Sequence, residues 1–287
     1  MTKTDYKFIR RSSLLLLVFV LFLISTILSS YLSGTKTDLV KVKFLNIGQG
    51  DAILIETASG RQVLIDGGAD KQVLQRLAEE LKFGDKKIDI VIASHPDSDH
   101  IGGLPYVFQQ YQIDAYLDSG VLTDGTAYQA IDNHINQNQT PHFYAVRGTQ
   151  IILDTDVVLT VLSPATTLSN FDTNTQSIIL RLDYGSSSVL FTGDAPQVIE
   201  EYLVKNNFNL SADILKVGHH GSKTSTADNF VQAVAPQYAA ISVGKNSYGH
   251  PAPEVLETLQ KNSVQILRTD ELGTISCLLS KVQIVCH

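Results

Sequence analysis

A loop dense in imidazole and carboxylate groups follows directly on an apolar run and limits the folds open to this chain. The run at 88–93 has the length and composition of a buried strand. The residues after it, at 94–103, read SHPDSDHIGG and hold these polar candidates: Ser94, His95, Asp97, Asp99 and His100. Ligand sites in open α/β sheets lie beyond the carboxyl ends of strands, and imidazole with carboxylate suits first-row divalent metals. The loop therefore predicts a metal site at a sheet edge rather than a solvated polar loop.

The rest of the pattern predicts an α/β protein. Short apolar or alternating runs bounded by turn residues predict strands over 40–46, 52–57, 62–66, 88–93, 113–117, 143–146, 150–153, 157–162, 177–184, 188–192, 213–217, 238–243, 264–267, 274–278 and 282–286. Apolar residues at helical spacing predict helices over 71–83, 103–111, part of 123–139, 196–206, 226–234 and 253–261. Gly102 and Gly103 would let the second of these helices begin close against the ligand-rich loop. We expect two mixed sheets, one per half of the chain, with helices on their outer faces.

The amino terminus reads as a membrane-type segment. Residues 12–35 carry no charge, and 14–24 are unbroken apolar. Four basic residues precede this run: Lys3, Lys7, Arg10 and Arg11. The positive-inside bias places the amino end in the cytoplasm and the bulk of the chain outside. A cleaved signal peptide and an uncleaved anchor are both open, and the lack of a small-residue cleavage site favours one hydrophobic anchor helix within 1–34, followed by a globular domain over 35–287.

Charge limits the partners of that domain. The 287 residues carry a formal net charge of −7, and 44% of them are apolar, which is ample for a core. Four basic residues against Asp5 give residues 1–34 a charge of +3, so the rest of the chain carries −10. An acidic globular part argues against tight, non-specific binding to long nucleic acid, but not against a focused metal site. Nothing in the sequence indicates an obligate protein partner.

Two cysteines, Cys277 and Cys286, stand in the predicted carboxy-terminal hairpin. They lack C-x-x-C spacing, which argues against a cysteine-based zinc site. A disulfide between the two strands would suit a domain outside the cytoplasm, and a pair of buried free thiols is the alternative.

Polar groups of similar chemistry stand at the ends of three other predicted strands. Asp194 follows one strand within FTGDA, and the pair His219 and His220 follows another within KVGHHGS. Asn174 and Ser177 lie where a third strand begins. Because strand ends at one edge of a sheet converge, these groups can join the ligand-rich loop in one distributed site.

Together these segments resemble the metallo-β-lactamase superfamily, and within it the carboxy-terminal domain of ComEC-type DNA-internalisation (competence) proteins. The resemblance covers roughly residues 40–280 and is carried by FLNIGQGDAILIE at 44–56, LIDGG at 64–68, SHPDSDHIGG at 94–103, NTQSIILRL at 174–182, LFTGDA at 190–195, LKVGHHGS at 215–222 and YGHP at 248–251. It implies a four-layer αββα sandwich of the α/β (α+β) class, with the site at the shared edge of the two sheets. It also implies a hydrolase that uses two divalent metal ions.

The resemblance assigns roles only where residues match. The superfamily's usual loop is His-x-His-x-Asp-His, and here the second imidazole is replaced by Asp97. By the resemblance, His95 and Asp97 would hold one metal, and Asp99 and His100 the other. Asp194 matches the carboxylate that bridges the two.

Further matches complete the implied site. One of His219 and His220 would complete the second metal, and the sequence does not distinguish between them. The superfamily's middle histidine is absent, and Asn174 stands near its position with Ser177 beside it. Asp66 matches a carboxylate that lies behind the ligands and orients one of them.

These substitutions have a chemical direction. Replacing imidazole by carboxylate and amide enriches the site in oxygen ligands, which favours manganese, with zinc or magnesium as alternatives. Two metals that activate a hydroxide and stabilise the attacked centre suit a phosphodiester substrate. Asp99 and the histidine pair are catalytic candidates as well as ligands, because the spare histidine of His219 and His220, or else His250, could protonate the leaving oxygen. His250 could equally be a structural group beside Tyr248, and His134, His142 and His287 are expected at the surface.

The expected function is a metal-dependent phosphodiesterase or nuclease outside the cell membrane, held by the anchor or secreted if that segment is cleaved. The resemblance implies degradation of one DNA strand during uptake. An envelope polymer with phosphorylcholine esters is a rival substrate for the same chemistry. A non-catalytic binding protein of the same fold is the alternative from another class, and the missing second histidine of the loop argues against β-lactam hydrolysis.

Overall fold

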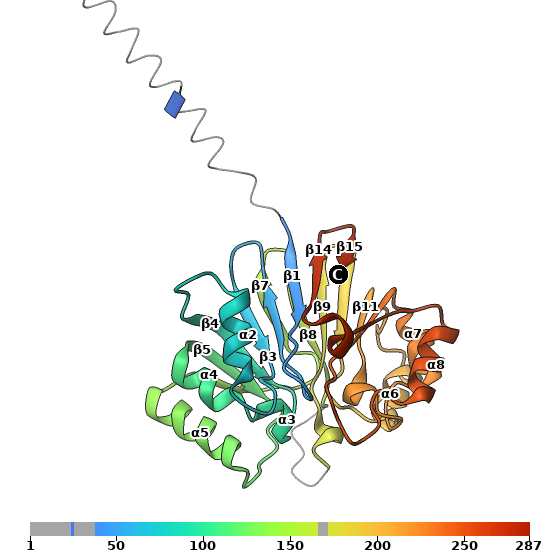
Figure 1. Ribbon diagram of the computed structural model, residues 1–287, viewed down its shortest axis with the longest axis horizontal. Coiled ribbons are helices and arrows are strands. Elements are labelled where there is room, and N and C mark those ends of the chain that lie inside the picture. Colours follow the sequence, from blue (N-terminus) through green and yellow to red (C-terminus); the bar gives the residue numbers. More distant parts are fainter. Residues whose placement is uncertain (1–23, 26–37, 166–171) are drawn as a thin grey trace, which may run out of the picture. The chain divides into compact units, whose positions relative to one another are not determined.

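The computed structural model describes residues 24–25, 38–165 and 172–287. Within the unit Leu39–His287, two sheets pack face to face and helices cover both outer sides (Figure 1). The αββα sandwich expected from the sequence is confirmed. The predicted anchor segment lies outside the described residues, apart from Ile24 and Ser25. In the described ranges no helix is both long and apolar enough to cross a membrane.

The first sheet has eight strands. They are Val40–Phe44 (β1), Ile53–Glu56 (β2), Gln62–Ile65 (β3), Lys87–Ala93 (β4), Gln112–Asp118 (β5), His142–Tyr144 (β6), Ile275–Leu279 (β14) and Ile284–Cys286 (β15). Their order is β15-β14-β1-β2-β3-β4-β5-β6. The strands β1 to β3 form an antiparallel meander, and β3 to β6 run parallel.

The second sheet has seven strands and repeats this plan. They are Gln150–Asp154 (β7), Val157–Ser163 (β8), Ile179–Tyr184 (β9), Ser187–Phe191 (β10), Ile214–Lys216 (β11), Tyr238–Ile241 (β12) and Gln265–Arg268 (β13), and they lie in the order β13-β12-β11-β10-β9-β8-β7. The strands β7 to β10 form an antiparallel meander, and β10 to β13 run parallel. In both sheets the parallel strands present their carboxyl ends to the loops that carry the site.

The carboxy-terminal hairpin departs from the expectation of one sheet per half. Its strand β14 pairs antiparallel with β1, with Val40 opposite Leu279, so the end of the chain completes the first sheet. A disulfide joins Cys277 in β14 to Cys286 in β15, at directly opposed positions. Of the two cysteine states that the sequence left open, the structure contains the disulfide.

Helices close the two outer layers of the sandwich. On the first sheet lie α2 (Gln72–Glu80), α4 (Leu104–Gln110) and α5 (Thr126–Asn138), and on the second lie α6 (Gln197–Lys205), α7 (Asp228–Val234) and α8 (Pro253–Lys261) (Figure 1). The short helices and 3-10 turns are α3 (Ser98–Ile101), α9 (Thr269–Leu272), η1 (Asn174–Gln176) and η2 (Gly218–Gly221). Alternation along β1 sends Val40, Val42 and Phe44 into the apolar layer between the sheets.

The two glycines that end the ligand-rich loop, Gly102 and Gly103, allow the close packing expected of them. A Cβ atom added to Gly103 would lie 2.0 Å from the carbonyl oxygen of Gly67. The Gly103 amide donates to the Gly68 carbonyl over 2.8 Å, and α4 begins at the next residue. The helix therefore starts against the loop after β3, which fixes the position of the ligand-rich loop between them.

Candidate metal centre

Loops from both sheets place the predicted ligands at one shared edge. The loop 94–103, here called the metal loop, follows β4 and turns into α3, which carries Asp99 and His100. Asp194 follows β10 in the second sheet, and the turn η2 after β11 carries the histidine pair. Parallel strands with neighbouring carboxyl ends thus bring residues together that lie more than a hundred positions apart in the sequence.

Asp194 lies at the middle of the cluster. Its carboxylate oxygens are 3.9 Å from His95 Nε2, 3.3 Å from His100 Nε2, 3.6 Å from His219 Nε2 and 3.7 Å from His220 Nε2. The Asp194 side chain is buried. A carboxylate within reach of four imidazoles suits a ligand shared between two cations.

Two carboxylates that are more exposed than Asp194 flank the cluster. Asp97 Oδ2 lies 3.7 Å from His95 Nε2, and Asp99 Oδ2 lies 3.3 Å from His220 Nε2. The ligand atoms form overlapping groups that could each hold a cation, among them His95 with His100 and Asp194, and Asp99 with His100 and His220. His220 is buried beside Asp99, whereas the His219 side chain is 28% exposed, so His220 is the member of the pair that joins Asp99 and His100 in a candidate ligand group.

Each buried imidazole is fixed through Nδ1 and points Nε2 toward Asp194. The Nδ1 atoms of His95, His100 and His220 lie 3.0 Å from Ser94 Oγ, 2.8 Å from Asp66 Oδ2 and 2.9 Å from the Ser242 carbonyl oxygen, respectively. A carbonyl only accepts, so His220 donates from Nδ1, and in the neutral imidazole its Nε2 carries the lone pair that could bind a cation.

The atoms that converge on the centre have no hydrogen-bond partner. They are Nε2 of His95, His100 and His220, and Oδ1 of Asp194, all buried. Leaving buried polar atoms unpaired costs about 1–3 kcal/mol each, and such groups call for an explanation. Imidazole nitrogens and carboxylate oxygens are first-row metal ligands, so these residues fit two divalent cations.

Asp66 and the histidine pair hold unusual backbone conformations. Asp66 has φ 61°, and its carboxylate accepts hydrogen bonds from the Ser94 amide (2.7 Å), the Ser94 hydroxyl (2.6 Å) and His100 Nδ1 (2.8 Å). It thus lies behind the ligands, where an orienting carboxylate belongs. His219 and His220 have φ 50° and 52°, a left-handed geometry that costs roughly 1–3 kcal/mol per residue. This turn is what directs His220 inward while His219 stays at the rim.

The other predicted site residues take different places. Ser177 is buried, and its Oγ accepts a hydrogen bond from the Asp194 amide over 3.2 Å. Asn174 lies on η1, with a buried Oδ1 that has no hydrogen-bond partner. The His250 ring lies 5.7 Å from the His219 ring and also 5.7 Å from the Tyr248 ring, so it stands at the rim of the cluster.

Two histidines that lacked a motif are only partly at the surface. His134 stacks edge-on against Phe108 at 5.2 Å, and His142 Nε2 lies 3.1 Å from Asp118 Oδ2. His142 was expected at the surface and is of intermediate burial, with its side chain 21% exposed. Neither residue contributes to the ligand groups described above.

Opposed charges set the protonation of the cluster in the absence of a cation. Burial disfavours the charged form of His220, but the carboxylates of Asp194 and Asp51 outweigh it and raise its pKa to about 9. Burial also opposes the charge of His100, yet Asp194 and Asp66 raise its pKa well above the ordinary value. Burial and the neighbouring His100 lower the pKa of His95 to about 4. The centre therefore attracts positive charge strongly, which divalent cations supply.

Two buried charges belong to the site although no motif singled them out. Asp51, in the loop between β1 and β2, is 1% exposed and pairs with fully buried Lys216 at the end of β11 over 2.6 Å. A lysine between the apolar residues Ile214, Leu215 and Val217 is the sequence signal that could have revealed a buried ion pair, because lysine is seldom buried without a partner.

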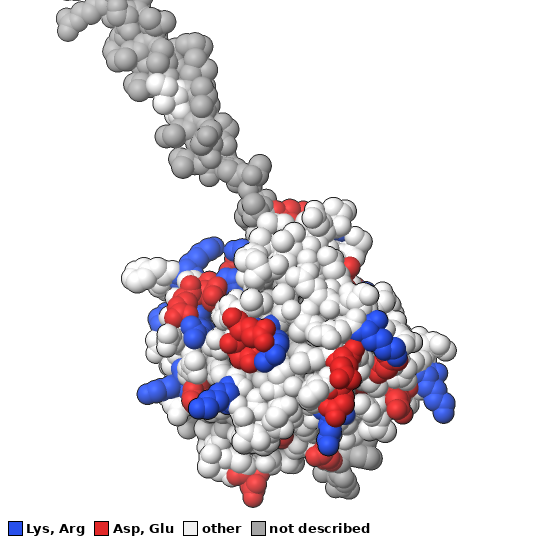
Figure 2. All heavy atoms as spheres, turned by 45° about the vertical axis from the view of Figure 1, so that its right-hand side comes forward, with Lys and Arg blue, Asp and Glu red and all other residues white. Residues whose placement is uncertain are grey.

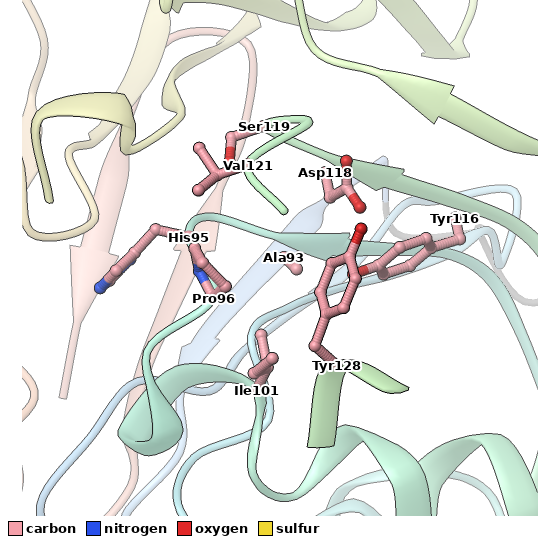
Figure 3. A pocket seen from close by; sticks show the side chains of 9 residues that line it. All are labelled: Ala93, His95, Pro96, Ile101, Tyr116, Asp118, Ser119, Val121 and Tyr128. Carbon is pink, nitrogen blue, oxygen red and sulfur yellow. The ribbon is translucent and has the colours of Figure 1, made fainter. Parts of the chain in front are cut away.

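A small pocket lies beside the metal loop. His95 and Pro96 border one side, and Tyr116, Tyr128 and Asp118 form the opposite side (Figure 3). Its volume of about 10 Å³ matches a single water molecule. A substrate group does not fit there, so substrate must reach the cluster from the side of the exposed carboxylates and His219.

Comparison with known proteins identifies relatives of this chain. A family model described as the metallo-beta-lactamase superfamily matches residues 45–245. The ComE operon protein 3 of Bacillus subtilis (strain 168) is 32% identical over 256 residues, which cover 82% of this chain and 32% of that protein. The competence protein ComA of Neisseria gonorrhoeae is 32% identical over 236 residues, which cover 79% of this chain and 30% of that protein. This chain spans about a third of the length of these curated relatives.

Solved structures agree on the fold. The metallo-beta-lactamase fold protein YhfI from Bacillus subtilis has a TM-score of 0.53 at 14% identity, covering 82% of this chain and 98% of that one. Igni18 from Ignicoccus hospitalis, described as a novel metallo hydrolase, has a TM-score of 0.55 at 14% identity with the same coverage. Identities this low establish a common fold and leave the substrate to be argued from the site.

Proposed function

This chain belongs to the metallo-β-lactamase superfamily, and from that premise we propose that it is a two-metal phosphodiesterase acting on DNA outside the cytoplasm. The observation that carries the proposal is the convergence of three buried, unpartnered Nε2 atoms, those of His95, His100 and His220, on Asp194. Superfamily members are generally metal-dependent hydrolases, and the fold commonly holds two divalent metals.

The protein's part in the reaction follows from its geometry. When bound, the two cations would supply the Lewis acidity that activates water and offsets developing negative charge. Asp194 and the anchored imidazoles would hold them, with Asp97 and Asp99 on the open side. His219, which is partly exposed beside Asp194, and His250 next to it are the residues placed to donate a proton to the leaving oxygen.

Manganese is the cation we propose for activity. Asp97 stands where the superfamily has an imidazole, and together with Asp99 and Asp194 it makes the donor set rich in carboxylate oxygen. Such a set shifts preference from zinc toward manganese or magnesium.

DNA is the proposed substrate on the strength of a relative that is named as a competence protein. The charge distribution favours a strand threaded into a local site over a duplex held along a basic face. On the face shown in Figure 2, acidic and basic side chains of the described residues are interspersed, without a basic stripe. A phosphorylcholine ester is the second substrate to assay, because an acidic protein needs little polyanion affinity to cleave it.

The deciding experiment combines metal content with hydrolysis. The detergent-solubilised full-length chain is stripped of metal, reloaded with manganese, magnesium or zinc, and assayed on end-labelled single-stranded and double-stranded DNA. We expect two cations per chain and strand cleavage that is fastest with manganese. Highest activity with zinc would overturn the preference for manganese, and a protein that binds no metal would overturn the site.

We also propose that residues 35–287 lie outside the cytoplasm. The Cys277–Cys286 disulfide supports this, because structural disulfides persist in oxidising compartments. The four basic residues ahead of the apolar run support the same orientation. Protease treatment of intact cells should remove the domain, and a domain protected until lysis would contradict the proposal.

A further inference from the structure

We propose that the buried Asp51–Lys216 pair positions His100 and His220 for the second cation and sets the charge that this cation meets. The inference rests on the proposed function only in requiring that the site binds metal. The pair comes from two different sheets: Asp51 lies between β1 and β2, and Lys216 ends β11.

The Asp51 carboxylate lies behind two ligand imidazoles. Its Oδ1 is 3.4 Å from His220 Nδ1, and its Oδ2 is 3.9 Å from His100 Nδ1. Oδ2 also meets Lys216 Nζ at 2.6 Å, whereas Oδ1 is buried without a hydrogen-bond partner. One carboxylate thus touches the rear of both imidazoles whose Nε2 atoms face the second-cation position.

The backbone of Asp51 ties it to the metal loop as well. Its amide donates to the Asp99 carbonyl over 3.2 Å, and its carbonyl accepts from the Gly68 amide over 2.7 Å. A Cβ on Gly50 would lie 2.2 Å from the Asp99 carbonyl oxygen, so the two loops are in backbone contact. A shift of Asp51 would therefore move Asp99, itself a candidate ligand, together with the histidines.

Fold stability alone does not account for this pair. Among the described residues, Lys216 is the only lysine or arginine that is buried. Removing two charges from water costs several kcal/mol per ion, and apolar residues in their place are often neutral or stabilising. Lys216 offsets one carboxylate in a centre that gathers Asp51, Asp66, Asp99 and Asp194. Its placement thus limits the negative charge at the site and holds Asp51 in one orientation.

The two members of the pair should respond in opposite ways. Asp51→Asn removes the charge behind His100 and His220, so we expect one of the two Mn²⁺ sites to weaken about 10–100-fold, as for other groups that orient metal ligands. Lys216→Met leaves an uncompensated carboxylate, so the metal-free protein should unfold at lower temperature while Mn²⁺ raises that temperature by more than in the wild type. The double variant should regain metal-free stability but keep the weakened site.

The measurements are Mn²⁺ titration calorimetry and thermal unfolding, with and without Mn²⁺, of the full-length chain in detergent. Lys43→Met is the matched control, since it removes a partly buried ion pair with Glu80 (2.6 Å) that lies away from the ligand groups. It should lower stability equally with and without Mn²⁺. If Asp51→Asn fails to fold, Lys216→Met and the double variant test the same pair.

Several outcomes would overturn the inference. Two Mn²⁺ sites of wild-type affinity in Asp51→Asn, with Mn²⁺-induced shifts in all variants like those of Lys43→Met, would make the pair merely structural. Complete loss of one Mn²⁺ equivalent would make Asp51 a direct ligand instead of a positioning residue. A wild-type protein that binds two Mn²⁺ but cleaves no phosphodiester would overturn the proposed function and leave this inference standing.

Discussion

In the proposed two-metal site Asp194 is the residue that both cations would share, because its carboxylate lies near imidazoles on either side. Asp194→Asn keeps the shape of the side chain but removes its negative charge and replaces one carboxylate oxygen by an NH2 group, which cannot bind a cation. We expect both cations to bind more weakly and phosphodiester hydrolysis to fall about 10³-fold or more, which corresponds to roughly 4 kcal/mol of transition-state stabilisation. Metal analysis and turnover on DNA measure the loss, and circular dichroism checks the fold.

Two histidine variants serve as comparisons for Asp194→Asn. His95→Ala should cost similarly through one cation alone, since its Nε2 lies 3.9 Å from Asp194 on one side of the cluster. His134→Ala removes a ring that packs on Phe108 and should leave turnover almost unchanged. Near-normal activity in a folded Asp194→Asn protein would contradict a metal site centred on Asp194.

Glu200 gives the stability of the protein a pH dependence that is separate from the metal centre. Its two carboxylate oxygens accept the amides of Thr226 and Ala227 over 2.7 Å and 2.9 Å, yet burial dominates and raises its pKa from 4.5 to about 7. A carboxyl group with a raised pKa in the folded state binds more protons when folded, so stability falls as pH rises from about 4.5 through about 7. The expected fall is roughly 2–4 kcal/mol.

Urea unfolding of wild type and Glu200→Gln at pH 5, 6, 7 and 8 isolates the contribution of Glu200 ionisation to the free energy of unfolding. The uncharged variant should show a flatter dependence, so the difference in free energy of unfolding between the two proteins should change across that range. A constant difference would show that Glu200 keeps its ordinary pKa in the folded protein.

At the scale of elements, the packing of α4 against the loop after β3 depends on Gly103. Gly103→Ala would bring a Cβ to 2.0 Å from the Gly67 carbonyl oxygen, so backbone must shift. Overpacking of this kind costs roughly 1–3 kcal/mol, occasionally more, and here it would also displace the metal loop. Chemical denaturation should show the loss, and Mn²⁺ affinity should fall with it.

Gly125→Ala is the comparison for that variant. Gly125 caps α5, and a Cβ there meets only the Thr123 side chain at 3.7 Å and 3.8 Å, which is ordinary contact. Its effect should be small. Equal losses in the two variants would mean that the close approach at Gly103 is not what limits the packing.

Sequence patterns predicted the positions of helices and strands better than they predicted which strands pair and which residues contact one another. The strand at 88–93 and the loop after it were predictable, because a buried parallel strand is an apolar run and its ligands follow at once. The pairing of β14 with β1 was not, since nothing local in either strand specifies a neighbour at the other end of the chain. The contact between Asp51 and Lys216 was not predictable for the same reason: a lysine between apolar neighbours indicates a buried partner, but nothing local identifies that partner as Asp51.

At the scale of the whole molecule, the centre joins loops from the two sheets, so cation binding should stabilise the entire sandwich. A ligand present at 100 times its dissociation constant adds about 2.7 kcal/mol, which for a domain of this size raises the unfolding temperature by roughly 5–10 °C. Thermal unfolding in EDTA and in excess Mn²⁺ measures this difference. Asp194→Asn should abolish most of it, and an unchanged temperature in the wild type would contradict binding at this edge.

The two-sheet architecture could be predicted from the sequence, because a meander followed by strand–helix alternation occurs in both halves. Which histidine of the pair points into the metal centre could not be predicted. The orientation of the two histidines depends on two consecutive left-handed residues in η2, and a His-His pair in a sequence does not predict that backbone geometry. The sequence could name both candidates, and only the fold of the turn separates them.

The pairing of Val40 with Leu279 also dictates an order of events. A chain that emerges amino end first, from a ribosome or across a bilayer, presents β1 long before β14 exists. During that interval β1 remains an edge strand, and the sheet that carries the metal loop is incomplete. Its last strands, β14 and β15, arrive only when residues 275–286 are delivered. If export accompanies synthesis, the centre matures on the far side of the membrane, and the ions available in that compartment decide which metal it receives.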